Sequence, residues 1–425
     1  MTARALLNGF SVRAPAFLLS LLAVAVPLAC SEDPTTEADA GVAALDAAPK
    51  PDAAPVIRPD AAAAPADDAT TADDAAANDD AGPSFSDAEP ACARNDAGRC
   101  VLLTWTATAA FPVAVDHHTA FVLSSTTGDY IHIVGGVRNA GDVVQEVYTA
   151  VRRARIAADG MIGAWEDTTP LPTPKAFHAQ AVHNGYVYLL AGVTADMTGP
   201  GASLTVLIGH MNGDGTVRAW FSGTRLPAVV RLHATAAVVH DHLYLIGGSS
   251  QEPLNNVTVA PIMADGSIGA WTAGTALPAA RSHHAAVVWD DRIYLIGGFG
   301  AGQAQANPVL RSVHDATGAL TGWEEVGTMP EAPWTSGAFV RNDFIYVVGG
   351  GEGSSFFSKY VDRVRRAPIG ADGHVGAFED VAAPLPRPRS HVHHAPYFNG
   401  HIYSIGGRRE QGLISLGEWT IGTFQ

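Results

Sequence analysis

The chain has 425 residues, of which 47% are hydrophobic and 16% are charged, and its formal net charge is −16. About −13 of that charge lies in residues 31–90, where 15 acidic residues accompany two basic ones. Residues 91–425 therefore carry only about −5, which gives no basic face for nucleic acid and no strong acidic field, so we expect no nucleic-acid partner.

Residues 1–30 have the pattern of an export signal. Arg4 and Arg13 accompany an apolar run that is too short for a comfortable membrane span and stops at Cys30. The ending Leu28-Ala29-Cys30 resembles a bacterial lipobox, although Pro27 stands where leucine is usual. The resemblance implies a lipid on Cys30 and an outer-membrane or cell-surface location. Ordinary secretion with cleavage nearby is the alternative.

Residues 31–90 consist mainly of Ala, Asp, Pro and Thr. They have too few large apolar side chains to offset the entropy of ordering, so we predict a disordered acidic linker of roughly 40 Å. The linker acts either as a spacer above a membrane or as filler. Cys92 and Cys100 stand close together at the start of the folded domain, residues 91–425, and we expect a small disulfide loop there in an oxidising compartment.

From about residue 101 the sequence repeats two short words, each six times, at intervals of about 50 to 60 residues. The first word is an apolar stretch that ends in paired glycine, as in IYLIGG at 293–298; the copy at 187–192, VYLLAG, has Ala191-Gly192 in place of the pair. The second is an aromatic residue followed by a short polar stretch and a proline. In five units the proline comes seven residues after a tryptophan; these are Trp105, Trp165, Trp220, Trp271 and Trp323. The sixth unit departs, with Phe378 as its aromatic.

Each unit reads as four short β-branched and aromatic-rich strands separated by Gly, Pro, Asn or Asp. Words such as ADGSIGAW at 264–271 place an Asp-Gly turn between the third and fourth strands. We predict an all-β fold, a six-bladed β-propeller with four strands per blade. The chain stops after a third strand, and 101–109 reads as an orphan fourth strand, so we expect the two terminal strands to pair and close the ring.

These glycine pairs, the following aromatic and the histidine that opens the next strand resemble the kelch family over about 325 residues, although the spacing from the glycine pair to the aromatic differs from the usual kelch pattern. They also resemble the kelch-like repeats of galactose oxidase-type and sialate mutarotase-type proteins. Galactose oxidase chemistry would require a copper site with a tyrosine crosslinked to a cysteine, and no cysteine follows Cys100. We expect no cofactor and no metal.

Histidines are the most concentrated polar chemistry in the chain, and they open the first, innermost strands. We expect them to surround the mouth of the central channel, on the face that also carries the long loops after the glycine pairs. Imidazole titrates near neutrality and ligates metals, but a repeated histidine also suits hydrogen bonds to neighbouring backbone. The candidates are His117, His118, His178, His233, His283, His284, His391, His393 and His394.

Arginines and aromatics add a second group of candidates. Arg231, Arg281 and Arg389 precede histidines and either recognise an anion at the mouth or bond to carbonyls between blades. The loops of the last two blades differ most from the others, and their aromatics and charges would suit a sugar or a peptide on an accessible rim. These rim candidates are Trp334, Phe356, Phe357, Arg408 and Arg409. Packing of Phe356 and Phe357 between blades is the alternative.

The sequence favours a surface-anchored lipoprotein that presents a non-catalytic propeller for protein, peptide or glycan binding, and we expect it to be a monomer. No nucleophile elbow, phosphate-binding loop or His-Glu-x-x-His word is present. A sugar mutarotase or epimerase, resembling the sialate mutarotases, is the enzymatic alternative, and a structural envelope protein is the third. A deep polar pocket with a carboxylate near His or Arg would favour the enzyme, and a shallow rim with exposed Trp334 would favour binding.

Overall fold

A computed structural model describes residues 102–108, 111–141, 143–194, 204–227, 231–354, 359–409 and 414–424. The predictions for the export signal, Cys30, the acidic linker, the Cys92–Cys100 pair, Phe356 and Phe357 lie outside these residues. The described part is all-β apart from one 3₁₀ turn, η1 (Ala301–Gln303), and contains no helix of the length and apolarity that a membrane crossing needs.

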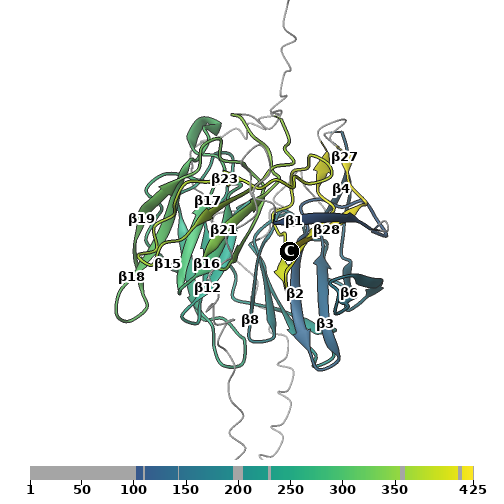
Figure 1. Cartoon of the computed structure of the whole chain (residues 1–425). Helices are drawn as coiled ribbons and strands as arrows, with labels where there is room; N and C mark the ends of the chain where they lie inside the picture. Colours follow the sequence, from purple (N-terminus) through teal and green to yellow (C-terminus); the bar gives the residue numbers. More distant parts are fainter. Residues whose placement is uncertain are drawn as a thin grey trace, which may run out of the picture. The chain divides into compact units, whose positions relative to one another are not determined.

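Six four-stranded antiparallel sheets form the blades of a β-propeller, as predicted (Figure 1). Blade I consists of β2 (Thr119–Ser125), β3 (Gly128–Val134), β6 (Val151–Ile156) and β7 (Ile162–Asp167). Blade II consists of β8 (Ala179–His183), β9 (Tyr186–Leu190), β10 (Val206–Met211) and β11 (Val217–Ser222). Blade III consists of β12 (Thr235–Val239), β13 (His242–Ile246), β14 (Val257–Pro261) and β15 (Thr272–Ala273). Blade IV consists of β16 (Ala285–Trp289), β17 (Arg292–Ile296), β18 (Pro308–His314) and β19 (Leu320–Thr328). Blade V consists of β20 (Gly337–Arg341), β21 (Phe344–Val348), β22 (Val364–Pro368) and β23 (Glu379–Asp380). Blade VI consists of β24 (Tyr397–Phe398), β25 (His401–Ile405), β28 (Trp419–Phe424) and β1 (Leu103–Ala107).

The two ends of the chain meet in blade VI. Strand β1 pairs with β28 in antiparallel register from Leu103 with Phe424 to Ala107 with Thr420. In Figure 1 the dark blue β1 lies beside the yellow β28 and the C-terminus. The predicted sharing of the sixth blade is therefore confirmed, and neither terminal strand is left as an open edge.

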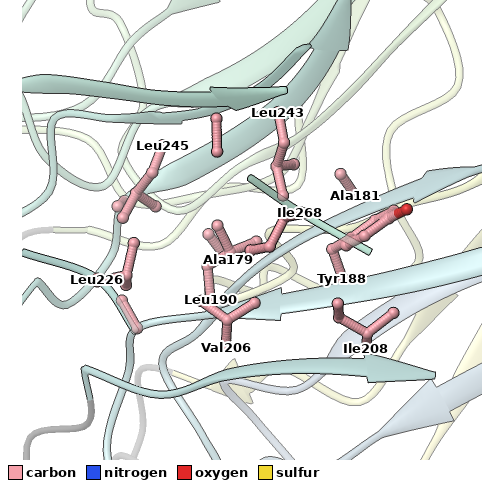
Figure 2. Packing of buried hydrophobic residues seen from close by; sticks show 13 residues of the cluster. Ala179, Ala181, Tyr188, Leu190, Val206, Ile208, Leu226, Leu243, Leu245 and Ile268 are labelled. Carbon is pink, nitrogen blue, oxygen red and sulfur yellow. The ribbon is translucent and has the colours of Figure 1, made fainter. Parts of the chain in front are cut away.

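The apolar cores lie between neighbouring blades, because each sheet has two faces and both are covered. The second strands are the most buried: the four residues that precede each glycine pair are mostly inaccessible to solvent. Figure 2 shows the core between blades II and III, where Leu190 and Ile208 of one sheet pack against Leu243, Leu245 and Ile268 of the other. Such inter-blade cores join the six sheets around the ring.

Two features repeated in the sequence join neighbouring blades. The indole Nε1 of the outer-strand tryptophan donates to a carbonyl of the preceding blade, as in Trp271 to Thr224 at 2.8 Å and Trp220 to Thr169 at 3.0 Å. The Asp-Gly words form the turns between third and fourth strands, and their glycines have positive φ, +78° at Gly266. The predicted Asp-Gly turn is confirmed, and the preceding blade holds it, because the Tyr188 hydroxyl donates to the carbonyl of Gly266.

The glycine pairs end the second strands where the chain passes close to the channel. Gly247 has φ +55°, and a Cβ atom there would lie 2.3 Å from the carbonyl oxygen of Arg281 in the next blade. Gly297 would place a Cβ atom 2.1 Å from the carbonyl oxygen of Pro333. Only glycine fits both the backbone conformation and the contact. After the pairs of blades I and VI the chain forms two small hairpins, β4 (Val137–Ala140) with β5 (Val143–Val147), and β26 (Arg408–Arg409) with β27 (Ile414–Ser415).

Candidate functional site

One residue from each blade occupies an equivalent position where the chain enters the innermost strand. In every blade the preceding residue forms an isolated bridge to the residue that follows the glycine pair. The next residue has a positive φ between 51° and 59°. These six residues, from blade I to blade VI, are His117, Phe177, His233, His283, Thr335 and His391.

Thirteen residues after four of the tryptophans stand His118, His178, His233 and His284, so spacing alone puts His233 in one set with the other three. The structure places His233 with His117 and His283 instead, one residue earlier in the repeat. The distance from Trp220 is misleading because blade III enters its first strand after a connection of different length. A backbone conformation, rather than a constant spacing, defines the position.

Backbone hydrogen bonds link these residues around the channel. The N–H of Phe177 donates to the carbonyl of His117 at 3.1 Å, that of His283 to His233 at 3.0 Å, and that of Thr335 to His283 at 2.8 Å. The backbone N–H of His391 bonds to the Thr335 hydroxyl oxygen at 3.1 Å. The left-handed residues of blades II to VI thus turn their amides toward the preceding blade.

The side chains meet in the channel as a packed axial cluster, which we define as His117, Phe177, His233, His283, His391 and His393. The rings of His233 and His283 stack with centroids 3.7 Å apart, those of His117 and Phe177 are 3.8 Å apart, and those of His117 and His391 are 4.2 Å apart. The axial cluster separates two cavities. We call them the loop-face cavity, of about 520 Å³, and the inner-strand cavity, of about 190 Å³.

The loop-face cavity opens among the long loops, as expected for the mouth of the channel. Its floor is the axial cluster, since His117, His233, His283 and His391 all line it. Of the residues in its polar walls, only Arg408 is among the rim candidates named from the sequence. These wall residues are Asn139, Ser249, Gln251, Glu252, Gln303, Tyr360 and Arg408.

The histidines that directly follow a residue of the axial cluster have a different place. His178 and His284 lie beside the first strand of the preceding blade, where Nε2 of His178 is 3.2 Å from the Thr119 hydroxyl and Nε2 of His284 is 2.8 Å from the Thr235 hydroxyl. These contacts tie neighbouring blades together. His118, His178 and His394 face the inner-strand cavity rather than the loop-face cavity. The sequence treated both sets of histidines as one ring.

Burial makes these imidazoles uncharged at neutral pH. It lowers the pKa of His117, His233 and His283 well below the ordinary value, and neighbouring histidines add to the effect because two charged rings would repel. The pKa of His284 falls to about 3 and that of His394 to about 4. Within the described residues, no three His, Cys, Asp or Glu side chains are arranged to hold a metal ion.

A fully buried carboxylate, Asp116, lies behind His117 and does not itself line the loop-face cavity. Asp116 contacts Nδ1 of His117, and its oxygens accept hydrogen bonds from the Asn139 amide at 2.9 Å and the Ser415 hydroxyl at 2.6 Å. Burial raises the pKa of Asp116 to about 6, although the bonds from Ser415 and Asn139 oppose the shift. Asn139 and Ser415 belong to the two small hairpins, so this network joins blades I and VI at the mouth.

Sequence reasoning missed Asp116 because no carboxylate recurs at its position. The available signal was this singularity: the equivalent residues in the other blades are Ala176, Leu232, Ser282, Trp334 and Ser390. In a repeat protein, a charged residue found in one unit alone is a candidate for a role that the repeat itself does not require.

The three arginines that precede the histidines are internal. Arg281 donates to the carbonyls of Leu295 at 3.3 Å and Pro308 at 2.9 Å, and Arg231 donates to Leu245 at 3.1 Å and to the Thr258 hydroxyl at 2.6 Å. Arg389 bonds likewise to the carbonyls of Ser404 and Gly406. All these acceptors belong to the arginine's own blade, so the expected bonds to carbonyls exist, but within blades rather than between them.

The expectation of an exposed rim at Trp334 is wrong. Its side chain is completely buried, stacks on Phe299 with centroids 5.3 Å apart and meets Tyr360 edge-on at 5.7 Å. The small residue Gly351 leaves room for the indole, because a Cβ atom there would lie 2.2 Å from it. Trp334 thus fills the inside of a loop in blade V. Arg408 reaches the loop-face cavity and donates to the carbonyl of Gly141 at 2.7 Å, and Arg409 is half-buried on the same hairpin.

Comparison with known proteins gives the same picture of the repeats. The Kelch motif matches residues 280–314, which cover the entry to blade IV and its first three strands. Beta-scruin of Limulus polyphemus is 25% identical over 240 residues, which are 53% of this chain and 25% of that protein. Kelch-like protein 36 of Bos taurus is 24% identical over 46% of this chain and 30% of that protein. The chain thus spans well under half the length of the curated relatives that it matches.

A solved structure, titled "Structure of YjhT", superposes with a TM-score of 0.54 over 73% of this chain and 95% of that chain, at 14% sequence identity. At this identity the likeness concerns the fold alone. The repeats, the ring of six sheets and these comparisons together support a kelch-repeat β-propeller.

Proposed function

We propose that the chain is a binding module that recognises its ligand at the loop-face cavity. The observation that carries this proposal is the cavity itself: about 520 Å³, open to the loops, and closed below by the axial cluster. This volume lies within the range typical of small-molecule sites. A kelch propeller is consistent with protein binding. Because the cavity is small and its walls are polar, the part of the ligand that enters it would be a compact polar group.

A sugar unit is the ligand that these walls fit best. Imidazoles that stay neutral, together with the amides of Asn139, Gln251 and Gln303, offer both donors and acceptors to hydroxyl groups. Phe299 and Tyr360 add aromatic surface on which an apolar sugar face can pack. We therefore propose glycan binding as the function, with the glycan borne on a cell-surface or secreted polymer.

The export signal and linker complete the proposal. A lipid on Cys30 would anchor the chain, and the acidic segment 31–90 would hold the propeller away from the membrane. Membrane fractionation tests the anchor. Cys30→Ala is expected to release the protein, and a variant that stays attached would show that Cys30 is not the lipidated residue.

A glycan and peptide array probed with the full chain tests the binding function. We expect selective glycan binding that Arg408→Ala weakens and that Arg409→Ala, on the neighbouring residue, leaves unchanged. Arg408 lines the cavity, whereas Arg409 does not. Exclusive binding of peptides, or equal loss in both variants, would contradict a glycan site in this cavity.

A sugar mutarotase is a second candidate, favoured by the contact of Asp116 with His117, which lines the cavity. We place it second because the Asp116 carboxylate is fully buried behind His117 and does not itself line the cavity. Opening the ring of a free sugar requires one proton to be given to the ring oxygen and another to be taken from the anomeric hydroxyl. A carboxyl whose pKa is near 6, beside a neutral imidazole, suits such exchange. NMR measurement of anomer exchange tests this candidate. A mutarotase would accelerate the exchange of the free sugar, and Asp116→Asn would abolish that acceleration. If the protein does not accelerate the exchange, the mutarotase is ruled out and the binding function stands.

A further inference from the structure

Three blades share an ion pair on their outer sheet surface. In blades I, IV and V an arginine on the third strand stands directly opposite a glutamate on the fourth. The pairs are Arg153 with Glu166, Arg311 with Glu324, and Arg366 with Glu379, at 3.2, 2.7 and 2.9 Å.

In blade I the guanidinium occupies a cradle between two blades. Arg153 lies over the ring of Tyr130, 4.4 Å from its centroid, and donates to the carbonyl of Asp214 in the turn of blade II at 2.6 Å. Glu166 completes the cradle. The pattern recurs elsewhere: Arg366 lies 4.4 Å from the centroid of the Phe344 ring, and Arg311 donates to the carbonyl of Asp372 in the next blade at 2.6 Å.

Blade II keeps the cradle but lacks the arginine. Its strands place Ile208 opposite Phe221, at the positions of Arg153 and Glu166. Tyr186 stands at the position of Tyr130, and the turn of blade III supplies Asp265. Between them lies a cleft of about 390 Å³ lined by Tyr186, Ile208, His210, Phe221, Asp265 and Ser267.

We propose that this cleft between blades II and III binds an arginine side chain of a partner polypeptide. The guanidinium would contact the carbonyl of Asp265, as Arg153 contacts that of Asp214. It would meet the edge of Tyr186, because the two faces of that ring already pack against His210 and Gly266. The Asp265 carboxylate adds charge complementarity: Oδ1 accepts hydrogen bonds from Ser267, whose bonds hold the pKa of this carboxyl below its usual range. It is therefore ionised at the mouth of the cleft.

Exposed apolar side chains beside the cleft favour a polypeptide over a free cation. Phe221 is 52% exposed and Met263 is 46% exposed, and both rank among the most exposed large hydrophobic residues in the described part of the chain. Tyr186 stacks on His210 with ring centroids 4.8 Å apart, which fixes the aromatic wall. The backbone and neighbouring side chains of a partner would cover Phe221 and Met263 while its arginine enters.

Blade III provides the natural comparison because it lacks the ion pair and parts of the cradle as well. Val259 stands opposite Thr272, His242 replaces the tyrosine, and Thr317 replaces the aspartate of the next turn. The missing arginine alone therefore does not define the site. The retained tyrosine and aspartate of blade II do.

The test uses methyl NMR of the full chain titrated with the peptide acetyl-Gly-Gly-Arg-Gly-Gly-amide, and with its lysine and citrulline analogues. The methyl signals of Ile208 and Met263 report on the cleft and its edge, away from the loop-face cavity. We expect these signals to shift with the arginine peptide and the citrulline peptide to bind at least tenfold more weakly, because citrulline keeps the shape but loses the charge.

Charge substitutions at exposed Phe221 make the proposal falsifiable without disturbing the core. Phe221→Glu restores the carboxylate found in blade I and is expected to tighten arginine-peptide binding about three- to fivefold, while Phe221→Lys is expected to abolish it. Thr272→Glu and Thr272→Lys, the matched changes in blade III, should leave the affinity unchanged.

Ile208 belongs to the core between blades II and III, so Ile208→Arg is used only if its denaturation curve shows a folded protein; its guanidinium should then occupy the cleft and prevent peptide binding. Three results would overturn the proposal: equal binding of arginine and citrulline peptides, unchanged affinity in Phe221→Lys, or shifts confined to methyl groups away from blades II and III. Free L-arginine that binds as tightly as the peptide would overturn the assignment to a polypeptide.

Discussion

The hydroxyl of Tyr188 in blade II donates a hydrogen bond to the carbonyl oxygen of Gly266 in blade III across 3.0 Å. Tyr294 makes the same bond to Gly373, and Tyr403 makes it to Gly160, each at 3.0 Å. The second strand of one blade thus holds the third-to-fourth turn of the next. The tyrosine of the first repeated word and the glycine of the Asp-Gly word form one inter-blade contact.

Removing this hydroxyl should therefore weaken the contact between two blades. We predict that Tyr188→Phe lowers the free energy of unfolding by about 1 kcal/mol, because a buried carbonyl loses its donor while the ring still packs. Urea denaturation measures the change. Tyr244→Phe is the matched control in blade III, where the ring meets His314 edge-on, and it should cost less. Equal losses would contradict the role of the hydroxyl.

The glycine pairs give a second prediction about stability. Gly247→Ala should lower the free energy of unfolding by about 3 kcal/mol or more, because the new methyl group would strike the Arg281 carbonyl in a backbone conformation that alanine resists. Gly400→Ala isolates the conformational cost, since φ is +80° there but a Cβ atom meets nothing within 4 Å. It should cost about 1 kcal/mol. Similar losses in both variants would show that the close approach is unimportant.

Most of the fold can be predicted from the sequence because the residues that make each structural contact recur in several repeats. The tryptophan, the Asp-Gly turn and the glycine pair each fix one point of a blade, and their order fixes the direction of its strands. The shared sixth blade follows as well, since Trp105 lies in a unit that lacks its first three strands. These inferences depend on local patterns and on the number of repeats, both of which a single sequence displays.

The site follows from the sequence only in outline. Histidines at the channel are visible, but which imidazoles reach the axis depends on one backbone conformation, and so His233 is assigned to the wrong set. Trp334 reads as exposed because its environment, the packing against Phe299 and Tyr360, comes from residues distant in the chain. Asp116 is overlooked for the opposite reason: it is unique, and a search for repeats passes over it.

The buried imidazoles predict that stability depends on pH. In the folded state their pKa values lie below 6.5, whereas in the unfolded chain each ring binds a proton below about pH 6.5. Stability is therefore fully present above pH 6.5 and falls as the pH drops, by up to about 1.4 kcal/mol per pH unit for each ring. Asp116 opposes this below about pH 6, because its raised pKa favours the folded state there.

Denaturation at pH 7.5, 6.5 and 5.5 measures this dependence, and His233→Phe is the matched variant. Blade II already carries Phe177 at the equivalent position, so phenylalanine fits the ring. The variant should lose stability less steeply with falling pH than the parent. A parent protein whose stability is flat between pH 7.5 and 5.5 would contradict the burial of neutral imidazoles.

The internal arginines give a prediction that separates structure from recognition. Arg281→Met should lower the free energy of unfolding by about 2 to 4 kcal/mol, because the Leu295 and Pro308 carbonyls lose a charged donor. Ligand affinity at the loop-face cavity should stay within about twofold, a change too small to indicate a lost contact. Thermal denaturation and a binding titration on the same sample measure both. If a stably folded Arg281→Met variant lost ligand affinity, Arg281 would have to be counted among the residues that bind the ligand.

Filling the loop-face cavity tests the proposed function most directly. Ser249 lines this cavity, whereas the next residue, Ser250, is exposed and does not. The measurement is the affinity of the best array glycan for Ser249→Trp and Ser250→Trp, each shown to be folded by its denaturation curve. We predict that Ser249→Trp lowers the affinity at least tenfold and that Ser250→Trp leaves it unchanged. Unchanged affinity in Ser249→Trp would contradict a ligand site in this cavity.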